Sequence, residues 1–329
     1  AEELTLPSWR TFSMQDPLER DAVEKMLVGV STRKYRRALD TVPPELDEFG
    51  TSKSAVSRRF IAATGRQLAD WLGRDLSGIQ LASIMIDGLG FDEHTVLIAL
   101  GIDAAGKKYV LGVHEGATEN TAACGALLDD LIERGVSTQR SLLFAIDGAK
   151  ALCSAIVARW DRRALLQRCQ VHKTRNVKDH LPDELHASVV ATMRQAYAMR
   201  DFKKAKHQLE NLARRLDDQH PSAAASVREG LAETLTVIKL GLPSTFARTF
   251  ATTNPIENLN GTARWICRNV KRWQGGTMIL RWCCAAMKEA QSRFRGVKAA
   301  TSGMPVLLAA LRENDRILDG AVDGAAEAG

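Results

Sequence analysis

Short apolar runs separated by turn residues occupy the middle of the chain. They have the length and residue types of buried strands, and they lie at residues 81–86, 94–102, 108–114, 141–146 and 164–167. Apolar residues take helical spacing instead at 119–134 and 150–160. Three strands, a helix, a strand, a helix and a strand predict an α/β fold in which helices cover a mixed sheet.

Helical patterning precedes the sheet region. Apolar residues recur at helical spacing from Val23 to Val30, and residues 33–39 continue the pattern as a basic helix. The segment Thr41-Val-Pro-Pro-Glu ends it, because proline disfavours a helix in itself and in the residue before it. Thr51 and Ser52 are N-cap candidates for a new helix. The residues expected on the buried side of that helix are Val56, Phe60 and Ala63.

The opposite side of this second helix carries short polar and basic residues. They are Ser54, Ser57 and Arg58, with Arg59 beside them, and no acid occurs from residue 50 to residue 69. Such side chains on a helix whose other face is packed suit insertion into the major groove of DNA. The alternative is an ordinary amphipathic surface helix, and the preceding turn is long for a helix-turn-helix.

Positive charge gathers near the end of the chain. The whole chain has a net charge of +6 and a pI of about 9.1. Residues 264–298 alone contain nine Lys or Arg against one acid, Glu289. Such clustering is the footprint of a polyanion partner, although for a single basic run alone a solvated helix face is the favoured explanation. The first four of these cations, Arg264, Arg268, Lys271 and Arg272, are candidate DNA contacts. Trp265, Trp273 and Trp282 lie among the basic residues, where they either stack on bases or pack inside.

The six cysteines do not form a zinc-finger or disulfide framework. None of their spacings matches a structural zinc motif, and the sequence has neither a signal peptide nor the roughly 20 apolar residues that a membrane span requires. We therefore expect a cytoplasmic protein that does not enter membranes and that is associated with the nucleoid when it is bound to DNA.

Two of the predicted strands end in the same tripeptide. Asp87 and Asp147 each stand between an Ile and a Gly, at the carboxyl end of a buried run. Open α/β sheets place ligands and catalytic groups at this edge. Two carboxylates on neighbouring strands repel each other unless a cation bridges them, and Mg²⁺ prefers such oxygen ligands. Taken alone, either Asp-Gly pair is explained as well by a simple turn as by a functional role.

A third carboxylate follows the motif Thr252-Thr-Asn-Pro-Ile. Pro255 fits the first turn of a helix and Asn254 its N-cap, so Glu257 projects from the first turn, where the helix dipole favours an ionised carboxylate. Two ions about 3.5–4 Å apart can activate an attacking oxygen and stabilise a leaving one. Asp87, Asp147 and Glu257 therefore form a candidate metal-binding triad for two Mg²⁺ or Mn²⁺ ions.

These motifs resemble the mutator-type family of bacterial insertion-sequence transposases. The resemblance includes both Asp-ending strands, Arg168-Cys-Gln-Val-His172-Lys-Thr-Arg-Asn176, Thr253-Asn-Pro-Ile-Glu257-Asn, Asn269-Val-Lys-Arg-Trp273 and Met278-Ile-Leu-Arg-Trp282. It implies a ribonuclease-H-like core with a helical insertion between the second Asp and the Glu. It also implies nicking at element ends and attack of the freed 3′-hydroxyl on target DNA. Asp87, Asp147 and Glu257 then carry over as the catalytic, metal-binding triad.

The resemblance also points to Cys169 and His172, which stand three residues apart in a Cys-x-x-His motif of this family. Their role is either to position the scissile strand or to brace the core. A packed cysteine beside a hydrogen-bonded histidine is the alternative, since two ligands are too few for a structural zinc site, which needs four. The residues that follow, Lys173, Arg175 and Asn176, are candidate phosphate contacts. By contrast, the cluster Asp92-Glu93-His94 is expected on the surface of a hairpin.

Taken together, the patterns divide the chain into five parts. They are an N-terminal helical DNA-binding region (1–76), the first part of the catalytic core (77–182), an all-helical insertion (183–244), the rest of the core with its basic helices (245–300), and a C-terminal tail (301–329). The main hypothesis is a DDE-type DNA transposase, acting as a homodimer on double-stranded DNA that comprises the inverted repeats of the element and the target. The alternatives are a DNA-binding regulator without chemistry and a nuclease of the same fold.

Overall fold

The computed structural model describes residues 17–38, 52–116 and 120–326. Several predicted positions lie outside this range: Leu39 at the end of the predicted basic helix, the break at residues 41–45, Thr51, and Glu119 at the start of the predicted helix at 119–134. The chain forms two compact units, each made of two separate segments. One unit combines the residues up to Arg74 with residues 259–292, and the other combines residues 75–258 with residues 293–329.

A five-stranded mixed sheet forms the centre of the larger unit. Its strands, in the order β3-β2-β1-β4-β5, are β1 (Leu81–Phe91), β2 (His94–Asp103), β3 (Lys108–Gly116), β4 (Leu142–Ile146) and β5 (Ala164–Arg168). The first three strands are antiparallel, whereas β4 is parallel to both β1 and β5. Every residue of β4 is buried, which explains why the central strands appear in the sequence as continuous apolar runs. The expected α/β class is thus confirmed.

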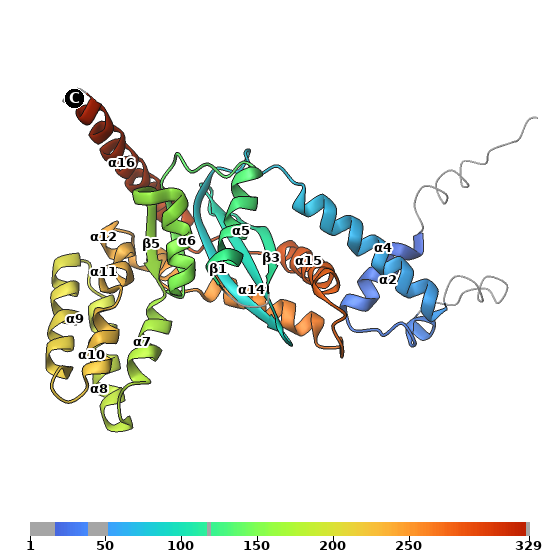
Figure 1. The fold of residues 1–329 in the computed structure, drawn as a ribbon, viewed down its shortest axis with the longest axis horizontal. Helices are drawn as coiled ribbons and strands as arrows, with labels where there is room; N and C mark the ends of the chain where they lie inside the picture. The colour runs from blue at the N-terminus through green and yellow to red at the C-terminus, as the bar shows by residue number, and fades with distance from the viewer. Residues whose placement is uncertain (1–16, 39–51, 117–119, 327–329) are drawn as a thin grey trace, which may run out of the picture. The chain divides into compact units, whose positions relative to one another are not determined.

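Helices α5 (Thr121–Glu133) and α6 (Lys150–Trp160) lie across one face of this sheet (Figure 1). Alternate strand residues, among them Ile84 and Phe144, pack against the apolar sides of both helices. Trp160 meets Phe144 edge to face, with 5.1 Å between the ring centroids. The packing fixes the sheet register, because a shift of one residue would turn every apolar side chain to the other face.

A helical insertion follows β5 and α7 (Gln170–Lys178) (Figure 1). It contains α8 (Asp183–Tyr197), α9 (Phe202–Leu216), α10 (Pro221–Arg228), α11 (Leu231–Thr234) and α12 (Thr236–Lys239). These helices share their own apolar core, to which Val177 of α7 belongs. The expectation of an all-helical segment between the second aspartate and the glutamate therefore agrees with the structure.

The larger unit ends in α13 (Ser244–Phe250), the start of α14 (Asn254–Cys267) and α16 (Ala300–Ala326). The residues predicted as a tail at 301–329 are helical as far as Ala326. The beginning of α16 is held by the rest of the unit: Leu307 is fully buried, and a Cβ at Gly303 would lie 2.0 Å from the Phe246 ring. Further along, Asp315 of α16 accepts hydrogen bonds from the backbone and side chain of Ser141.

The smaller unit is helical. It contains α2 (Pro17–Leu27), a 3₁₀ turn (Tyr35–Ala38), α4 (Lys53–Leu72), the part of α14 from Leu259 onward and α15 (Gly276–Ser292). Phe60 of α4 packs against Trp282 of α15, with 4.6 Å between their ring centroids. Within this unit, α15 packs on α4. Among the described residues, no helix is both long and apolar enough to span a bilayer.

The basic helix predicted at 33–39 is a single 3₁₀ turn within the described residues. A tertiary contact explains why the helix is so short. Tyr35 is fully buried, and its hydroxyl donates a hydrogen bond to Asp21 of α2. This contact turns the chain back onto α2 after Leu27, and a continuous helix would carry Tyr35 away from that partner.

Candidate active site

Asp87 lies within β1, and Asp147 directly follows β4, the parallel neighbour of β1. The strand expected to end at Asp87 continues to Phe91, because β2 pairs with it along its whole length. The parallel pairs between β1 and β4 run from Ser83 with Leu143 to Met85 with Ala145, and extending this register two residues, to the residue after β4, would set Asp147 opposite Asp87. Neighbouring strands lie about 4.7–4.9 Å apart, and paired residues of a parallel ladder direct their side chains to the same face. Both aspartates are half-buried, so they are shielded but reachable.

The loop after Asp147 turns away at once. The Asp147 carboxylate accepts a hydrogen bond from the Ala149 backbone N–H, at 2.9 Å. Gly148 has a φ of +102°, a conformation that side-chain-bearing residues rarely adopt, and a Cβ there would lie 3.1 Å from Arg168 Cδ. The glycine therefore allows the chain to leave the strand end without covering the aspartate.

Glu257 enters the site from α14. The backbone carbonyl of Thr253 accepts the hydrogen bond of the Glu257 N–H, at 2.9 Å, so Thr253 rather than Asn254 is the N-cap residue. The predicted cap is thus one residue out of place. The Thr253 hydroxyl donates to the Glu257 carboxylate, and Thr253 is fully buried. The buried Thr253 hydroxyl thereby fixes the Glu257 carboxylate in the first turn of α14.

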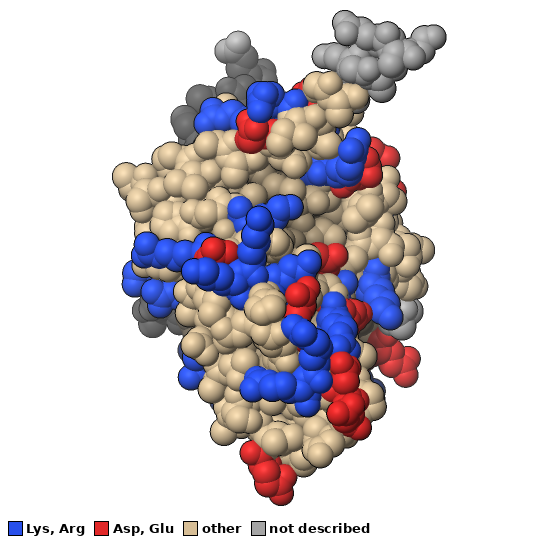
Figure 2. Space-filling view, turned by 90° about the vertical axis from the view of Figure 1, so that its left-hand side faces the viewer, with Lys and Arg blue, Asp and Glu red and all other residues tan. Residues whose placement is uncertain are grey.

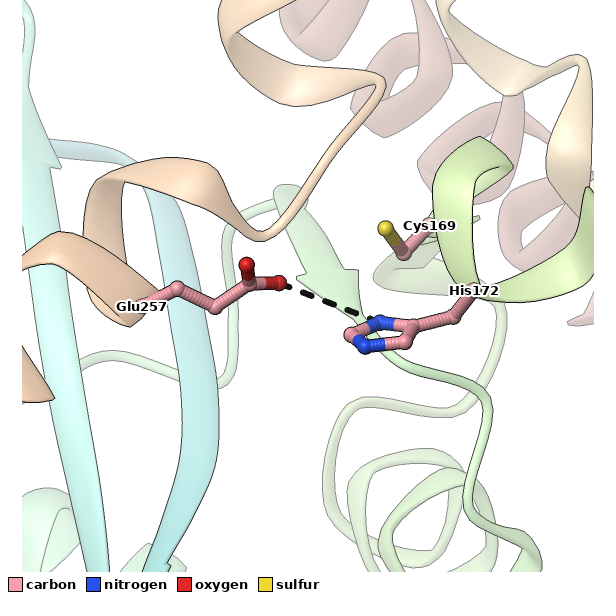
Figure 3. Close-up of side chains that lie close together, drawn as sticks. All are labelled: Cys169, His172 and Glu257. Atoms are coloured by element: carbon pink, nitrogen blue, oxygen red, sulfur yellow. Dashed lines mark ion pairs between the residues drawn. The ribbon is translucent and has the colours of Figure 1, made fainter. Parts of the chain in front are cut away.

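Cys169 and His172 lie beside Glu257 (Figure 3). His172 Nδ1 is 3.9 Å from Glu257 Oε1 and 3.4 Å from the Thr253 hydroxyl. One ligand atom each of Cys169, His172 and Glu257 lies within 4.8 Å of the other two. In Figure 3, the imidazole points from α7 toward the carboxylate on α14, and the thiol lies beside the imidazole.

Backbone hydrogen bonds explain why α7 begins at this point. The Cys169 N–H donates to the carbonyl of Ile146, at 2.7 Å, which is the residue before Asp147. The next residue, Gln170, donates its N–H to the carbonyl of Ala251, at 2.9 Å, shortly before α14 begins. The start of α7 therefore joins the strand end that carries the second aspartate to the helix that carries the glutamate.

The electrostatics of Cys169 and His172 favour a charged pair. Burial alone raises the pKa of the Cys169 thiol, but hydrogen bonds from His172 and Thr253 outweigh it and bring that pKa below its ordinary value. The hydrogen bond with Cys169 raises the pKa of His172 in spite of burial, and the negative charges of Glu257 and Asp147 raise it further. His172 is thus under the influence of two of the three predicted acids.

Among the residues that the structure describes, the close trio of potential metal ligands is Cys169, His172 and Glu257, and both aspartates lie outside it. The glutamate shares its nearest neighbours with the Cys-x-x-His motif, while Asp87 in β1 and Asp147 directly after β4 belong to two adjacent parallel strands.

Comparison of the sequence with known protein families gives a match over most of the chain. The family model described as "Transposase, Mutator family" matches residues 12–296. The chain belongs to this Mutator family of transposases. The suspected resemblance is therefore confirmed.

Several relatives are transposases of insertion sequences. One, for element IST2 of Acidithiobacillus ferrooxidans, is 28% identical over 204 residues, which cover 62% of this chain and 68% of the relative. Another, for IS6120 of Mycolicibacterium smegmatis, is 26% identical over 290 residues, or 85% and 88% of the two chains. A third, for IS256 in Tn4001 of Staphylococcus aureus, is 27% identical over 256 residues, or 74% and 62%.

In this Mutator-family chain, Lys173 is not available as a surface cation. Its side chain is 5% exposed, and its ammonium donates to the carbonyl of Ser226, at 2.9 Å, and lies 3.5 Å from Glu229. Burial lowers the pKa of Lys173, against the opposing effect of Glu229. Lys173 therefore joins α7 to the insertion, while the neighbouring Arg175 and Asn176 are exposed.

Arg168 makes a second link from the site to the insertion, which sequence reasoning did not single out. Its guanidinium donates to Glu233 and lies 3.6 Å from Glu229. A Cβ at Gly230 would lie 2.5 Å from Arg168 Nε, so only glycine leaves room for the guanidinium there. The partners lie more than sixty residues away in sequence, so local pattern gives no signal for this link.

The candidate DNA contacts of α4 differ in exposure. Ser52 caps the helix by accepting the Ala55 N–H at 3.2 Å, and the predicted buried side is confirmed. Ser54 and Arg58 are exposed, whereas Ser57 and Arg59 are half-buried.

The basic residues of the predicted run are on the surface. Arg264, Arg268, Lys271 and Arg272 are all exposed. Trp265 is 54% exposed, and the Arg268 guanidinium stacks 4.0 Å from its ring centroid. Trp282 is buried, so packing is its role, whereas Trp265 is exposed. Trp265 with Arg268 forms the kind of aromatic and cationic platform on which bases stack.

Charge on the face that carries the helical insertion is mixed (Figure 2). Lys and Arg are spread across this face, with acidic residues among them. In α9, for example, exposed Lys203 and Lys204 follow the exposed acid Asp201, which caps that helix. Charge alone does not mark the insertion as a DNA-binding surface.

Proposed function

We propose that this chain is a DDE-type DNA transposase that cleaves at the ends of an insertion element and transfers the freed 3′-hydroxyl into target DNA. The proposal rests above all on the places of Asp87 and Asp147, one within β1 and the other directly after β4, which are adjacent parallel strands. Glu257 supports it, since its carboxylate lies 3.9 Å from His172 of α7, and the residue before α7, Cys169, is hydrogen-bonded to Ile146, directly before Asp147. The strand order, with three antiparallel strands followed by two parallel ones, is compatible with a ribonuclease-H-like core.

The donor set fits divalent ions that prefer oxygen. Asp87, Asp147 and Glu257 would hold Mg²⁺ or Mn²⁺, because two carboxylates on adjacent strand positions are stable together only when a cation offsets their repulsion. When bound, such ions activate the attacking oxygen and stabilise the leaving one.

The chain's own residues prepare the site. Gly148 leaves the second strand end open, and Thr253 orients the glutamate through a hydroxyl that donates to its carboxylate. Arg168 lies behind the Asp147 loop and ties it to α11 through Glu233. No side chain is required to form a covalent intermediate, because a water or a 3′-hydroxyl attacks the phosphate directly.

DNA is the partner in this proposal. The exposed cations of the smaller unit would neutralise phosphates, with Trp265 and Arg268 as a stacking platform. Two element ends must be held together for joining, so we infer a homodimer on DNA.

The decisive experiment is a strand-transfer assay with pre-cleaved element ends and the Asp147→Asn variant. Loss of a ligand that contributes several kcal/mol should reduce joining by roughly 1,000-fold or more, while DNA binding remains. The control is Asp161→Asn, an exposed aspartate after α6, whose φ of +46° asparagine tolerates. Full joining by Asp147→Asn would overturn the proposal. DNA binding by wild type without any cleavage would favour a regulator, and cleavage without joining would favour a nuclease.

A further inference from the structure

The trio of Cys169, His172 and Glu257 has a different chemistry from the three acids. It offers a sulfur, an imidazole nitrogen and a carboxylate oxygen, all within 4.8 Å of one another. Sulfur and imidazole ligands favour Zn²⁺ and similar transition metals, whereas Mg²⁺ prefers carboxylates and water. We propose that these three residues form a binding site for a thiophilic divalent ion, with Zn²⁺ as the natural probe, and that its occupation withdraws Glu257 from the acid triad and inhibits the enzyme.

The spacing is close to what such an ion requires. With bonds of about 2.3 Å to sulfur and about 2.0–2.2 Å to nitrogen and oxygen, tetrahedral ligands lie roughly 3.4–3.6 Å apart. His172 Nδ1 and Glu257 Oε1 are 3.9 Å apart in the structure. The three ligand atoms lie within 4.8 Å of one another, so side-chain rotations would have to bring them closer around an ion. Three protein ligands and one open position are the arrangement of zinc sites that are accessible to solvent.

The surroundings favour metal entry and retention. The Cys169 side chain is buried, while those of His172 and Glu257 are 25% and 39% exposed, so the trio opens to solvent through two of its members. The backbone of Cys169 is fixed by its hydrogen bond to Ile146, and the Thr253 hydroxyl holds the glutamate. The ligands are therefore largely positioned before an ion arrives, and Figure 3 shows them directed toward one another.

The inhibitory half of the proposal rests on the proposed function, because it requires Glu257 to be a ligand of the catalytic ions. A carboxylate that is bound to Zn²⁺ together with a thiolate and an imidazole is no longer free to complete an oxygen site. The binding half does not depend on any activity.

The binding half is tested by titrating the full chain with Co²⁺, which follows Zn²⁺ chemistry and is visible by absorption. We expect one equivalent to produce a thiolate-to-metal charge-transfer band, which Zn²⁺ then displaces. Cys169→Ser should remove that band, and His172→Asn should weaken binding by roughly 100-fold or more, since even outer groups of metal sites contribute 10- to 100-fold. The matched control is Cys153→Ser, a half-buried cysteine outside the trio, which should keep the band.

The absence of a charge-transfer band in wild type, or the same band in Cys169→Ser, would overturn the site. Should Cys169→Ser fail to fold, His172→Asn decides the question, because His172 is partly exposed at the start of α7.

The inhibitory half is tested by adding Zn²⁺ to the strand-transfer assay at saturating Mg²⁺. Wild type should lose joining, and His172→Asn should need at least tenfold more Zn²⁺ for the same loss. If Zn²⁺ binds in the Co²⁺ displacement assay but joining continues, the inhibitory half is overturned. If wild type shows no joining with any metal, the proposed function fails instead, and the absorption titration still decides the binding site.

Discussion

The sheet unit and the helical unit hold their candidate functional groups in different ways. In the sheet unit, the backbone of two adjacent parallel strands positions the aspartates. Asp87 lies within β1, and Asp147 directly follows β4, in which every residue is buried. In the helical unit, cations such as Arg264 and Lys271 stand on exposed surfaces at the ends of long side chains. A carboxylate fixed by a sheet tolerates almost no displacement, whereas an exposed cation reaches a phosphate from many positions.

This difference predicts how each unit responds to change. Chemistry at a metal centre depends on geometry within a fraction of an ångström, so one altered residue in the sheet unit should be decisive. Phosphate binding is the sum of several similar contributions, so single changes on the helical unit should be mild and additive. The exception is the core of the helical unit, which holds its two chain segments together.

The largest expected effect concerns that core. Phe60→Ala removes the ring that packs on Trp282 and leaves a cavity between α4 and α15. We expect a loss of about 3–5 kcal/mol in the stability of this unit. Hydrogen exchange should show the amides of α4 and α15 losing protection together, although the helices are far apart in sequence.

The matched control is Phe294→Ala, whose ring is only half-buried and which follows α15. Phe294→Ala should lower the stability much less than Phe60→Ala does. If α15 keeps its protection in Phe60→Ala while α4 loses it, the two segments do not form one cooperative unit, and the comparison drawn above fails.

A smaller loss of stability is expected just after β4, at Gly148. Gly148→Ala forces a side-chain-bearing residue to a φ of +102° and brings its Cβ to 3.1 Å from Arg168 Cδ. The strain should cost about 1–3 kcal/mol of stability, and the displaced Asp147 should lower strand transfer more than stability alone explains.

Gly241→Ala separates these two consequences. Gly241 also has a positive φ, of +67°, but its added Cβ meets nothing within 4 Å. It should cost about 1–2 kcal/mol and leave joining by the folded protein unchanged. Equal joining rates per folded molecule in Gly148→Ala and wild type would show that the backbone at the strand end does not fix the aspartate. Thermal unfolding and joining rates measured on the same samples decide it.

The elements that were predictable from sequence are those encoded by local pattern. The strand ending in Asp147 and the helix at 150–160 were predicted to within a residue or two, because a continuous apolar run or helical spacing requires no distant partner. The two aspartates followed from these strands. Ser52 as a cap and the buried side of α4 followed from short-range rules in the same way.

The remaining features depend on partners far along the chain. Lys173 resembles an exposed cation in sequence, and only the later arrival of Ser226 and Glu229 turns it inward. The start of α16 gives no signal in sequence for the partner it packs on, and Leu307 is buried only because the rest of the unit packs on it. Likewise, proximity of the Cys-x-x-His motif to Glu257 requires the backbone contacts of α7 with β4 and Ala251, which no spacing rule contains.

The smallest expected effect lies on the surface of the helical unit. Lys271→Ala removes one exposed cation from the basic run. If that cation neutralises a phosphate, binding to a duplex should weaken roughly five-fold at 0.15 M salt, and the slope of log affinity against log salt should fall by about 0.9. Arg316→Ala is the control, because this exposed cation on α16 is paired with Glu313. An unchanged slope in Lys271→Ala would mean that its ammonium does not meet the phosphate backbone, and the DNA-binding surface would then have to be sought on another part of the unit, with α4 and its exposed Arg58 as the next candidates.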